Sequence, residues 1–156
     1  MQYCNFEQAR ASLDTEIDRL LNDGKLTQEQ VDMIDRKTLN EFLSTKLIDR
    51  IIASQLVMRE KRFTARLKPS DVFDEYKGVK TDVTVIIQGA VDLAFVEDGK
   101  LVIVDYKTDR VKDITKLAGL YKKQLYLYKS AMEQSEELTV KECILCSIHL
   151  GAYITV

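Results

Sequence analysis

The pair Asp98-Gly99 constrains this 156-residue chain most, because it separates two apolar runs of the kind that form neighbouring strands. Asp-Gly between runs rich in β-branched residues is the strongest short-range signal for a two-residue hairpin turn. Such a turn pairs Glu97 with Lys100, and the same register places Asp92 directly opposite Asp105. The two runs that would form the strands are Ala90–Val96 and Leu101–Tyr106.

Opposed residues of an antiparallel pair share one face of the sheet, with Cβ atoms roughly 5 Å apart. Two carboxylates at about 4 Å repel by roughly 4 kcal/mol at an effective dielectric constant of about 20. We therefore expect Asp92 and Asp105 to hold a cation or to share a proton. Lys107 projects from the same face as Asp105, whereas Tyr106 points to the other side. Two oxygen ligands beside an ammonium group suit metal-dependent phosphodiester hydrolysis.

An ordinary hairpin with a solvated ion cluster is the alternative interpretation of these charges. The predicted face does not have the composition of a generic polar exterior, which favours the functional interpretation. Its apolar members are Ala90, Ala94, Leu101 and Ile103.

Composition predicts one soluble globular domain, since 46% of the residues are hydrophobic, 31% are charged and the net charge is −2. We expect no signal peptide and no membrane span, and three cysteines suggest a reducing cytoplasm. Cys143, Cys146 and His149 have metal-ligand spacing, but an offset of three alternates faces along a strand, so we expect structural thiols. Basic charge concentrates in the central region, at Lys68, Lys77, Lys80, Lys107, Arg110, Lys112, Lys116, Lys122 and Lys123.

Apolar spacing predicts three helices ahead of the sheet, which would form a helical cover. The first spans Phe6 to Leu21, the second opens at the capping box Thr27-x-x-Gln30, and a short third one contains Leu47 to Ile52. Further on, Asp113 can cap a helix that runs to about Gln134.

The predicted strands begin with Leu56–Leu67, which a loop containing Pro69 follows. Thr81–Gln88 and Val91–Val96 form two strands or one long strand bent by a bulge at Gly89. The terminal strands are Thr139–His149 and Ala152–Val156.

Gln124 lies in the middle of an apolar and aromatic stripe on the predicted long helix. A buried amide needs polar partners, so we expect Gln124 to face the hairpin with its acidic pair. A partly exposed glutamine at the edge of the stripe is the alternative. The rest of the stripe is Leu117, Tyr121, Tyr128 and Ala131.

Three ordered motifs in this chain resemble those of the RecB-like branch of the PD-(D/E)XK nucleases. They are Gly89-x-x-Asp92, Asp105-Tyr-Lys-Thr-Asp109 and Gln124-x-x-x-Tyr128. The longer string Val104 to Arg110, the Arg59-Glu60-x-x-Phe63 segment and the Ser-Ile-His-Leu-Gly ending resemble the nuclease domain of AddA-type helicase–nuclease subunits. The similarity covers nearly the whole chain.

The resemblance implies an α+β fold (α/β in the broad sense): a restriction-endonuclease-like mixed β-sheet flanked by helices. Residues 1–156 would be one nuclease domain, with a helical cover over residues 1–55 and a catalytic core over residues 56–156.

The resemblance also implies roles for individual residues. Asp92, Asp105 and the backbone carbonyl of Tyr106 would bind metal, and Lys107 would be the catalytic lysine. Gln124 and Tyr128 would position the active site and the DNA, and Glu60 matches an acidic position that is a further candidate ligand.

By the same resemblance, the activity would be that of a DNA exonuclease using Mg²⁺, for which Mn²⁺ could substitute. The domain would belong to a helicase–nuclease that acts in double-strand-break repair with an AddB-like partner subunit. ATP would serve only a helicase portion absent from this chain, since no phosphate-binding G-x-x-x-x-G-K-[ST] loop occurs. The alternatives are a module that binds DNA without cutting it and a cluster of purely structural value.

One departure from the family concerns its usual Gly-Thr-x-x-His segment, whose histidine also binds metal. The chain opens with Met1-Gln-Tyr-Cys-Asn-Phe6 and has His149 as its only histidine, near the far end. We therefore expect an excised domain of a longer protein that binds metal weakly.

Overall fold

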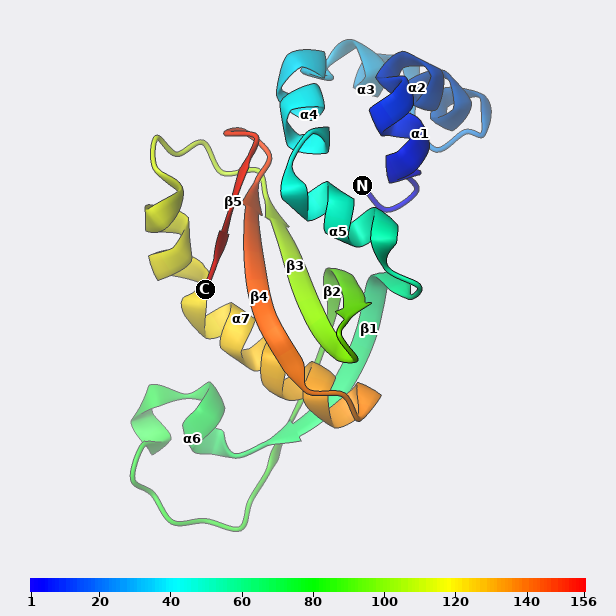
Figure 1. Cartoon of the computed structure of the whole chain (residues 1–156). Helices are drawn as coiled ribbons and strands as arrows, with labels where there is room; N and C mark the ends of the chain where they lie inside the picture. Colours follow the sequence, from blue (N-terminus) through cyan, green and yellow to red (C-terminus); the bar gives the residue numbers. More distant parts are fainter.

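The computed structural model describes all residues, 1–156, and contains one five-stranded mixed sheet flanked by helices (Figure 1). The strands follow one another across the sheet in chain order. Neighbouring strands are antiparallel except β3 and β4, which run parallel. The predicted fold class is therefore confirmed. The strands are β1 (Val57–Leu67), β2 (Val85–Glu97), β3 (Lys100–Lys107), β4 (Val140–Ser147) and β5 (Ala152–Thr155).

Five short helices precede the sheet, where the sequence predicted three. Ser12 divides the first predicted helix, because its extended backbone ends α1 while its side chain accepts the Thr15 N–H and caps α2. The capping box of Thr27 and Gln30 is present, but the helix it opens stops early, and Asp35 caps a new one. The helices are α1 (Phe6–Ala11), α2 (Leu13–Asn22), α3 (Gln28–Asp32), α4 (Arg36–Leu43) and α5 (Lys46–Ala53).

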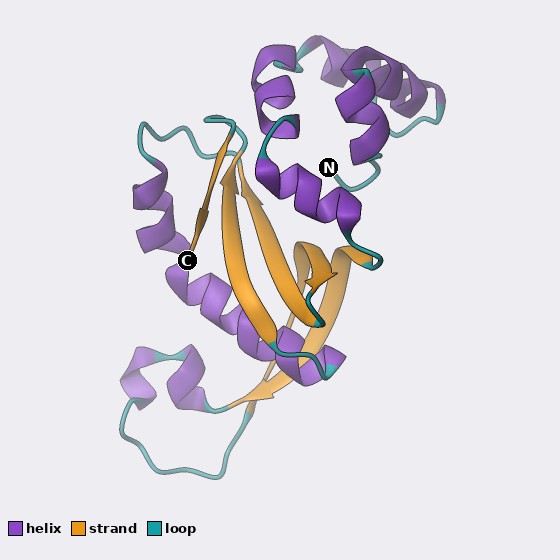
Figure 2. Cartoon of the chain, viewed as in Figure 1, coloured by secondary structure: helices purple, strands orange, loops and turns teal.

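The connection between β1 and β2 projects away from the sheet (Figure 2). It contains α6 (Pro69–Val72) and the short 3₁₀ helix η1 (Asp74–Tyr76), where the sequence predicted a loop. Pro69 occupies the first turn of α6, a position at which its missing N–H costs nothing.

The long helix α7 (Ile114–Glu136) forms the crossover between the parallel strands β3 and β4. Asp113 caps it as predicted, by accepting the Thr115 N–H.

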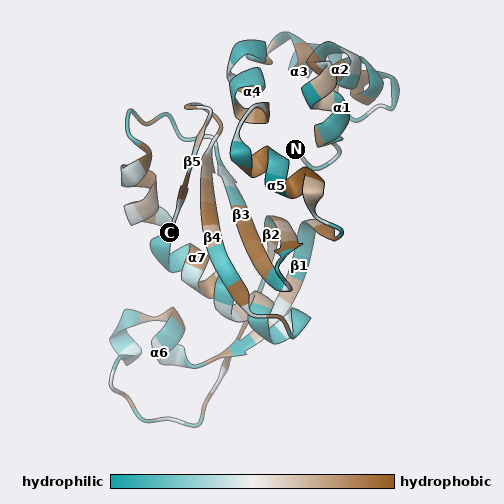
Figure 3. Cartoon of the chain, viewed as in Figure 1, coloured by the Kyte–Doolittle hydropathy of each residue, from teal (hydrophilic) through white to brown (hydrophobic).

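The two faces of the sheet bury separate hydrophobic clusters, and the strands and the inner side of α5 carry most of the apolar colour in Figure 3. One cluster joins α1, α4 and α5 to the sheet, and the other joins α7 to the opposite face. The first contains Phe6, Phe42, Leu47, Ile48, Leu93, Phe95, Val102 and Val104; the second contains Phe63, Val91, Ala94, Leu101, Ile103, Leu117, Leu125 and Met132.

The irregular position in the first two strands is at Asp92, not at Gly89. Gly89 pairs in register with Phe63, and a Cβ atom there would lie 2.7 Å from the Phe63 ring, so glycine meets a packing need. The side chains of Val91 and Ala94 are both buried on the face of the sheet that packs against α7, although the two residues are three positions apart. The alternation of faces along β2 therefore reverses between them. The predicted bulge at Gly89 is therefore wrong.

Candidate active site

The hairpin between β2 and β3 has the predicted two-residue turn. Asp98 and Gly99 have φ values of 53° and 70°, the left-handed conformations that a type I′ turn requires at both positions. The ladder runs from Glu97–Lys100 to Leu93–Val104, which confirms the register derived from the sequence. The ladder ends there, one position before Asp92 and Asp105, whose proximity is seen in the rise that the Asp92 charge causes in the pKa of Asp105.

Asp92 bridges β2 and β3 with its side chain where the ladder between them ends. Its Oδ2 accepts a hydrogen bond from the backbone N–H of Tyr106 at 2.8 Å. The pairing of β2 with its other neighbour, β1, skips one position. Arg59 pairs with Leu93 and Lys61 pairs with Val91, while Glu60, between them, is unpaired and has a φ of 48°. The interruption of both ladders places a half-buried carboxylate beside β3.

Asp105 is 2% exposed, in contrast to an ordinary strand aspartate. Burial raises the pKa of its carboxyl group, the ammonium of Lys107 opposes this rise, and the negative charge of Asp92 adds to it. Lys107 Nζ lies 2.7 Å from Asp105 Oδ2, but outside hydrogen-bond alignment, so this buried oxygen has no aligned donor. The ammonium of Lys107 therefore compensates this buried carboxylate as an ion pair.

Lys107 connects the acidic pair to α7. Its Nζ donates to Gln124 Oε1 at 3.0 Å, and Gln124 Nε2 donates to the hydroxyl oxygen of Tyr128 at 2.7 Å. Tyr128 in turn packs edge-on against Phe63, with ring centroids 5.7 Å apart. The amide of Gln124 therefore faces the hairpin, as its place in the apolar stripe predicts.

Tyr121 is a member of this cluster that the sequence indicated only as part of the α7 stripe. Its ring centroid lies 4.0 Å from Lys107 Nζ, and its hydroxyl lies 3.1 Å from each carboxylate oxygen of Asp109. The helical spacing to Gln124 and Tyr128 was the available signal, because residues three and four apart share one helix face.

The remaining predicted site residues lie on the other side of β3. Tyr106 packs its ring edge-on against Phe42, and its buried hydroxyl has no hydrogen-bond partner. Burial raises the pKa of this hydroxyl. Glu60 is exposed and lines a cavity of about 480 Å³ together with Asp92 and Tyr106. The ligand roles of Glu60 and of the Tyr106 carbonyl stay predictions.

Asp92 and Asp105 offer the ligand type that a hard divalent cation prefers. Such cations take carboxylate oxygens, and magnesium sites use one or two carboxylates with water and phosphate completing the shell. Asp105 Oδ2 supplies a buried oxygen without an aligned donor. No group of three or more histidine, cysteine, aspartate or glutamate side chains is placed to hold a metal ion.

The two buried cysteines point to opposite faces of β4, as expected from their spacing. Cys143 belongs to the α7-side cluster and Cys146 to the other one, while His149 is exposed. Burial raises the pKa of the Cys143 thiol to about 11. All three cysteines are free.

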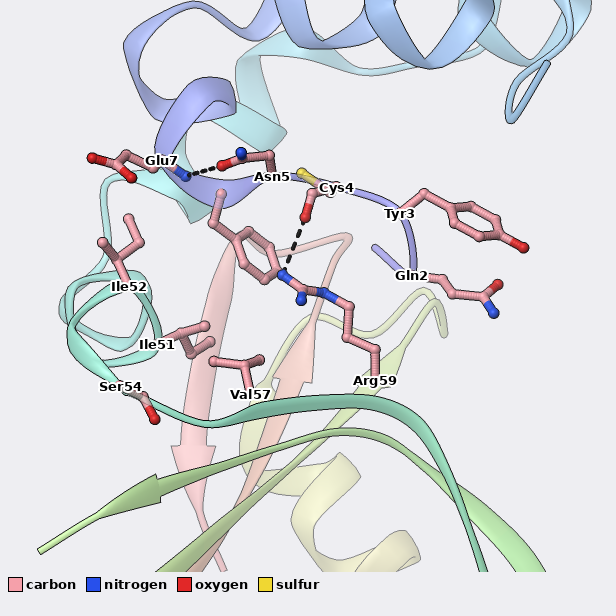
Figure 4. Close-up of a pocket in the computed structure, with 11 residues that line it drawn as sticks. Gln2, Tyr3, Cys4, Asn5, Glu7, Ile51, Ile52, Ser54, Val57 and Arg59 are labelled. Atoms are coloured by element: carbon pink, nitrogen blue, oxygen red, sulfur yellow. Dashed lines mark hydrogen bonds between the residues drawn. The ribbon is translucent and has the colours of Figure 1, made fainter. Parts of the chain in front are cut away.

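A separate pocket of about 360 Å³ lies between the N-terminal segment, α5 and β1 (Figure 4). Arg59 donates to the carbonyl oxygen of Cys4 at 3.1 Å, and its guanidinium lies 5.1 Å from the centre of the Phe6 ring. None of the residues lining this pocket belongs to the Asp–Lys cluster. No helix of the structure has both the length and the apolar character of a membrane span.

Comparisons with known proteins match this chain to one family and to several bacterial relatives. The profile described as the PD-(D/E)XK nuclease superfamily matches residues 5–152. The relatives are named as subunits of an ATP-dependent helicase/nuclease. The relative from Clostridium botulinum (strain 657 / Type Ba4) is 30% identical to this chain, and the match covers the whole chain but 12% of the relative. Those of Clostridium acetobutylicum and Geobacillus thermodenitrificans are 28% and 32% identical over 100% and 88% of the chain.

This chain spans only 12 to 13% of the length of these relatives, so the similarity concerns one part of much longer proteins. The family match, in contrast, covers nearly all of its residues, including the hairpin, α7 and both parallel strands. The chain belongs to the PD-(D/E)XK nuclease superfamily.

Proposed function

We propose that this chain is a metal-dependent DNA exonuclease domain whose active site is formed by Asp92, Asp105, Lys107, Gln124 and Tyr128. The observation that carries the proposal is the buried carboxylate of Asp105, in ion-pair contact with a lysine that α7 holds through Gln124. A charged group in a largely apolar interior is costly, and such costs are typical of functional sites.

Asp92, Asp105 and the backbone carbonyl of Tyr106 would hold Mg²⁺, for which Mn²⁺ could substitute. When bound, the ion would supply an activated water and would polarise the phosphoryl oxygen. Lys107 carries a fixed positive charge beside the reacting phosphate, where it orients the water and offsets the charge that develops.

Gln124 and Tyr128 act on this lysine from the helix. Gln124 Oε1 accepts from Lys107, and the Gln124 amide nitrogen donates to Tyr128, so the ammonium is directed by a chain of two hydrogen bonds. The role of the pair in the proposed reaction is to keep the lysine aimed at the phosphate.

The proposed setting is a helicase–nuclease that acts in double-strand-break repair with an AddB-like partner subunit. The names of the relatives support the first part, since they combine ATP-dependent helicase and nuclease in one protein. ATP would act outside this chain, and the three free cysteines fit a reducing cytoplasm.

Cleavage of labelled DNA with and without Mg²⁺ or Mn²⁺ tests the proposal. We expect the chain to degrade linear but not circular single strands, only with metal, and Lys107→Ala to abolish this activity. Lys100→Ala is the matched control, because Lys100 is exposed at the turn end of the same strand. Cleavage that survives Lys107→Ala would contradict the assigned role, and binding of DNA without any cleavage would favour the non-cleaving module.

A further inference from the structure

Tyr121 joins the lysine of the candidate site to the loop that follows β3. It lies in the second turn of α7, with its ring centroid 4.0 Å from Lys107 Nζ. Its hydroxyl lies 3.1 Å from both oxygens of Asp109, which is two residues beyond the end of β3. The face of the Tyr121 ring thus contacts the Lys107 ammonium, while the hydroxyl at the edge of the ring contacts the Asp109 carboxylate.

The ring completes the surroundings of the Lys107 ammonium. Asp105 Oδ2 is 2.7 Å from Nζ, Gln124 Oε1 is 3.0 Å away, and the Tyr121 ring covers a third side. The lysine side chain is consequently only 14% exposed. A lysine has a flexible four-carbon stem, so its ammonium needs several partners to stay in one position.

We propose that Tyr121 is a positioning residue that holds the Lys107 ammonium over its ring, with Asp109 fixing the orientation of that ring. The role in catalysis rests on the proposed nuclease function, whereas the contact itself can be measured without activity. A cation over an aromatic face gains stabilisation that grows as the pair is removed from water.

A purely structural role for Tyr121 is the competing explanation, because its ring also packs beside the apolar cluster under α7. That role predicts effects on stability alone. The positioning role predicts a change at Lys107, and Tyr126 provides a matched control, since it lies on the same helix and is 53% exposed.

Nuclear magnetic resonance of protein labelled with ¹³C-lysine tests the contact directly. The ring current of Tyr121 should shift the ε-methylene protons of Lys107 upfield, with the resonance assigned by its absence in Lys107→Arg. We expect this shift to disappear in Tyr121→Leu, to shrink in Tyr121→Phe, which keeps the ring but lacks the hydroxyl that contacts Asp109, and to persist in Tyr126→Leu. An unchanged Lys107 resonance in Tyr121→Leu would overturn the proposal.

Should Tyr121→Leu fail to fold, Tyr121→Met serves instead, because methionine fills irregular gaps without an aromatic face. The same loss of the upfield shift is expected, and its retention overturns the proposal. Asp109→Ala tests whether Asp109 fixes the orientation of the ring. The upfield shift of the Lys107 ε-methylene protons should shrink in this variant, and an unchanged shift would show that Asp109 does not fix the ring.

Kinetics on linear single-stranded DNA with Mn²⁺ then test the catalytic consequence. Tyr121→Leu should lower kcat by about tenfold with KM unchanged, because the ring acts through a group used in the transition state. If Tyr121→Leu loses the ring-current shift but keeps the kcat of the unmodified protein, the catalytic role of Tyr121 is overturned. Absence of cleavage by the unmodified chain would instead refute the proposed function, and the resonance of Lys107 would still decide the contact.

Discussion

The residue that ties the candidate site together is Lys107, because its neighbours come from two elements of the fold, its own strand β3 and the helix α7. Asp105 precedes it on β3, while Tyr121 and Gln124 reach it from α7. The register of the hairpin could be predicted from the sequence, since the Asp98-Gly99 turn fixed which residues face one another from Glu97–Lys100 to Leu93–Val104. The Tyr121 ring could not, because periodicity places a residue on a helix face without identifying its contact across the fold.

Two glutamines of α7 allow activity and stability to be separated. Gln124→Leu removes the acceptor of Lys107 and should lower DNA cleavage by at least about tenfold with a small change in melting temperature. Gln134→Leu removes both hydrogen bonds to the backbone of Arg66 and should cost about 1 kcal/mol of stability with cleavage retained. Parallel melting and cleavage assays check both; a large loss of stability with intact cleavage in Gln124→Leu would make Gln124 a structural residue.

At the scale of elements, the turn end of the hairpin is joined to α5 and β4 by a charged network. Arg50 of α5 donates to both oxygens of Glu97 at 2.8 and 2.7 Å and also pairs with Glu142. Lys141 pairs with Glu97 and with Asp98 of the turn. This network holds the helical layer to the end of the sheet farthest from Lys107.

Glu97→Gln should therefore reduce stability in a pH-dependent way. The side-chain hydrogen bonds of Arg50, then Lys141, lower the pKa of Glu97 from 4.5 to about 2. A carboxylate with a lowered folded pKa stabilises the protein fully above its unfolded pKa, and this stabilisation is lost as the pH falls toward 2. The variant should be less stable by about 1 kcal/mol near neutral pH, with the difference vanishing in acid.

Denaturant unfolding of both proteins across this pH range measures the effect. A stability difference that stays constant from neutral pH into acid would show that the charge of Glu97 is not its cause. Lys100→Ala provides a reference at the residue that pairs with Glu97 across the ladder without belonging to the network.

For the whole molecule, the strand segments along the chain and the position of α7 could be predicted, whereas the number of helices could not. The helical spacing of apolar residues continues across Ser12 and so predicts one helix. In the structure Ser12 ends α1 and caps α2. The reversal of faces at Asp92 could not be predicted either; it coincides with the positive φ of Glu60 on the neighbouring strand, which the sequence pattern does not reveal. Both failures concern local backbone geometry that apolar periodicity does not encode.

The central claim is that Asp92 and Asp105 together hold one divalent cation beside Lys107. Titration with Mn²⁺, followed by the electron paramagnetic resonance of the free ion, tests it most directly. We predict one weak site that is lost in Asp92→Asn and in Asp105→Asn and is retained in Lys107→Ala, because two carboxylates supply the charged ligands. Mn²⁺ binding that remains unchanged in both aspartate variants would contradict the account.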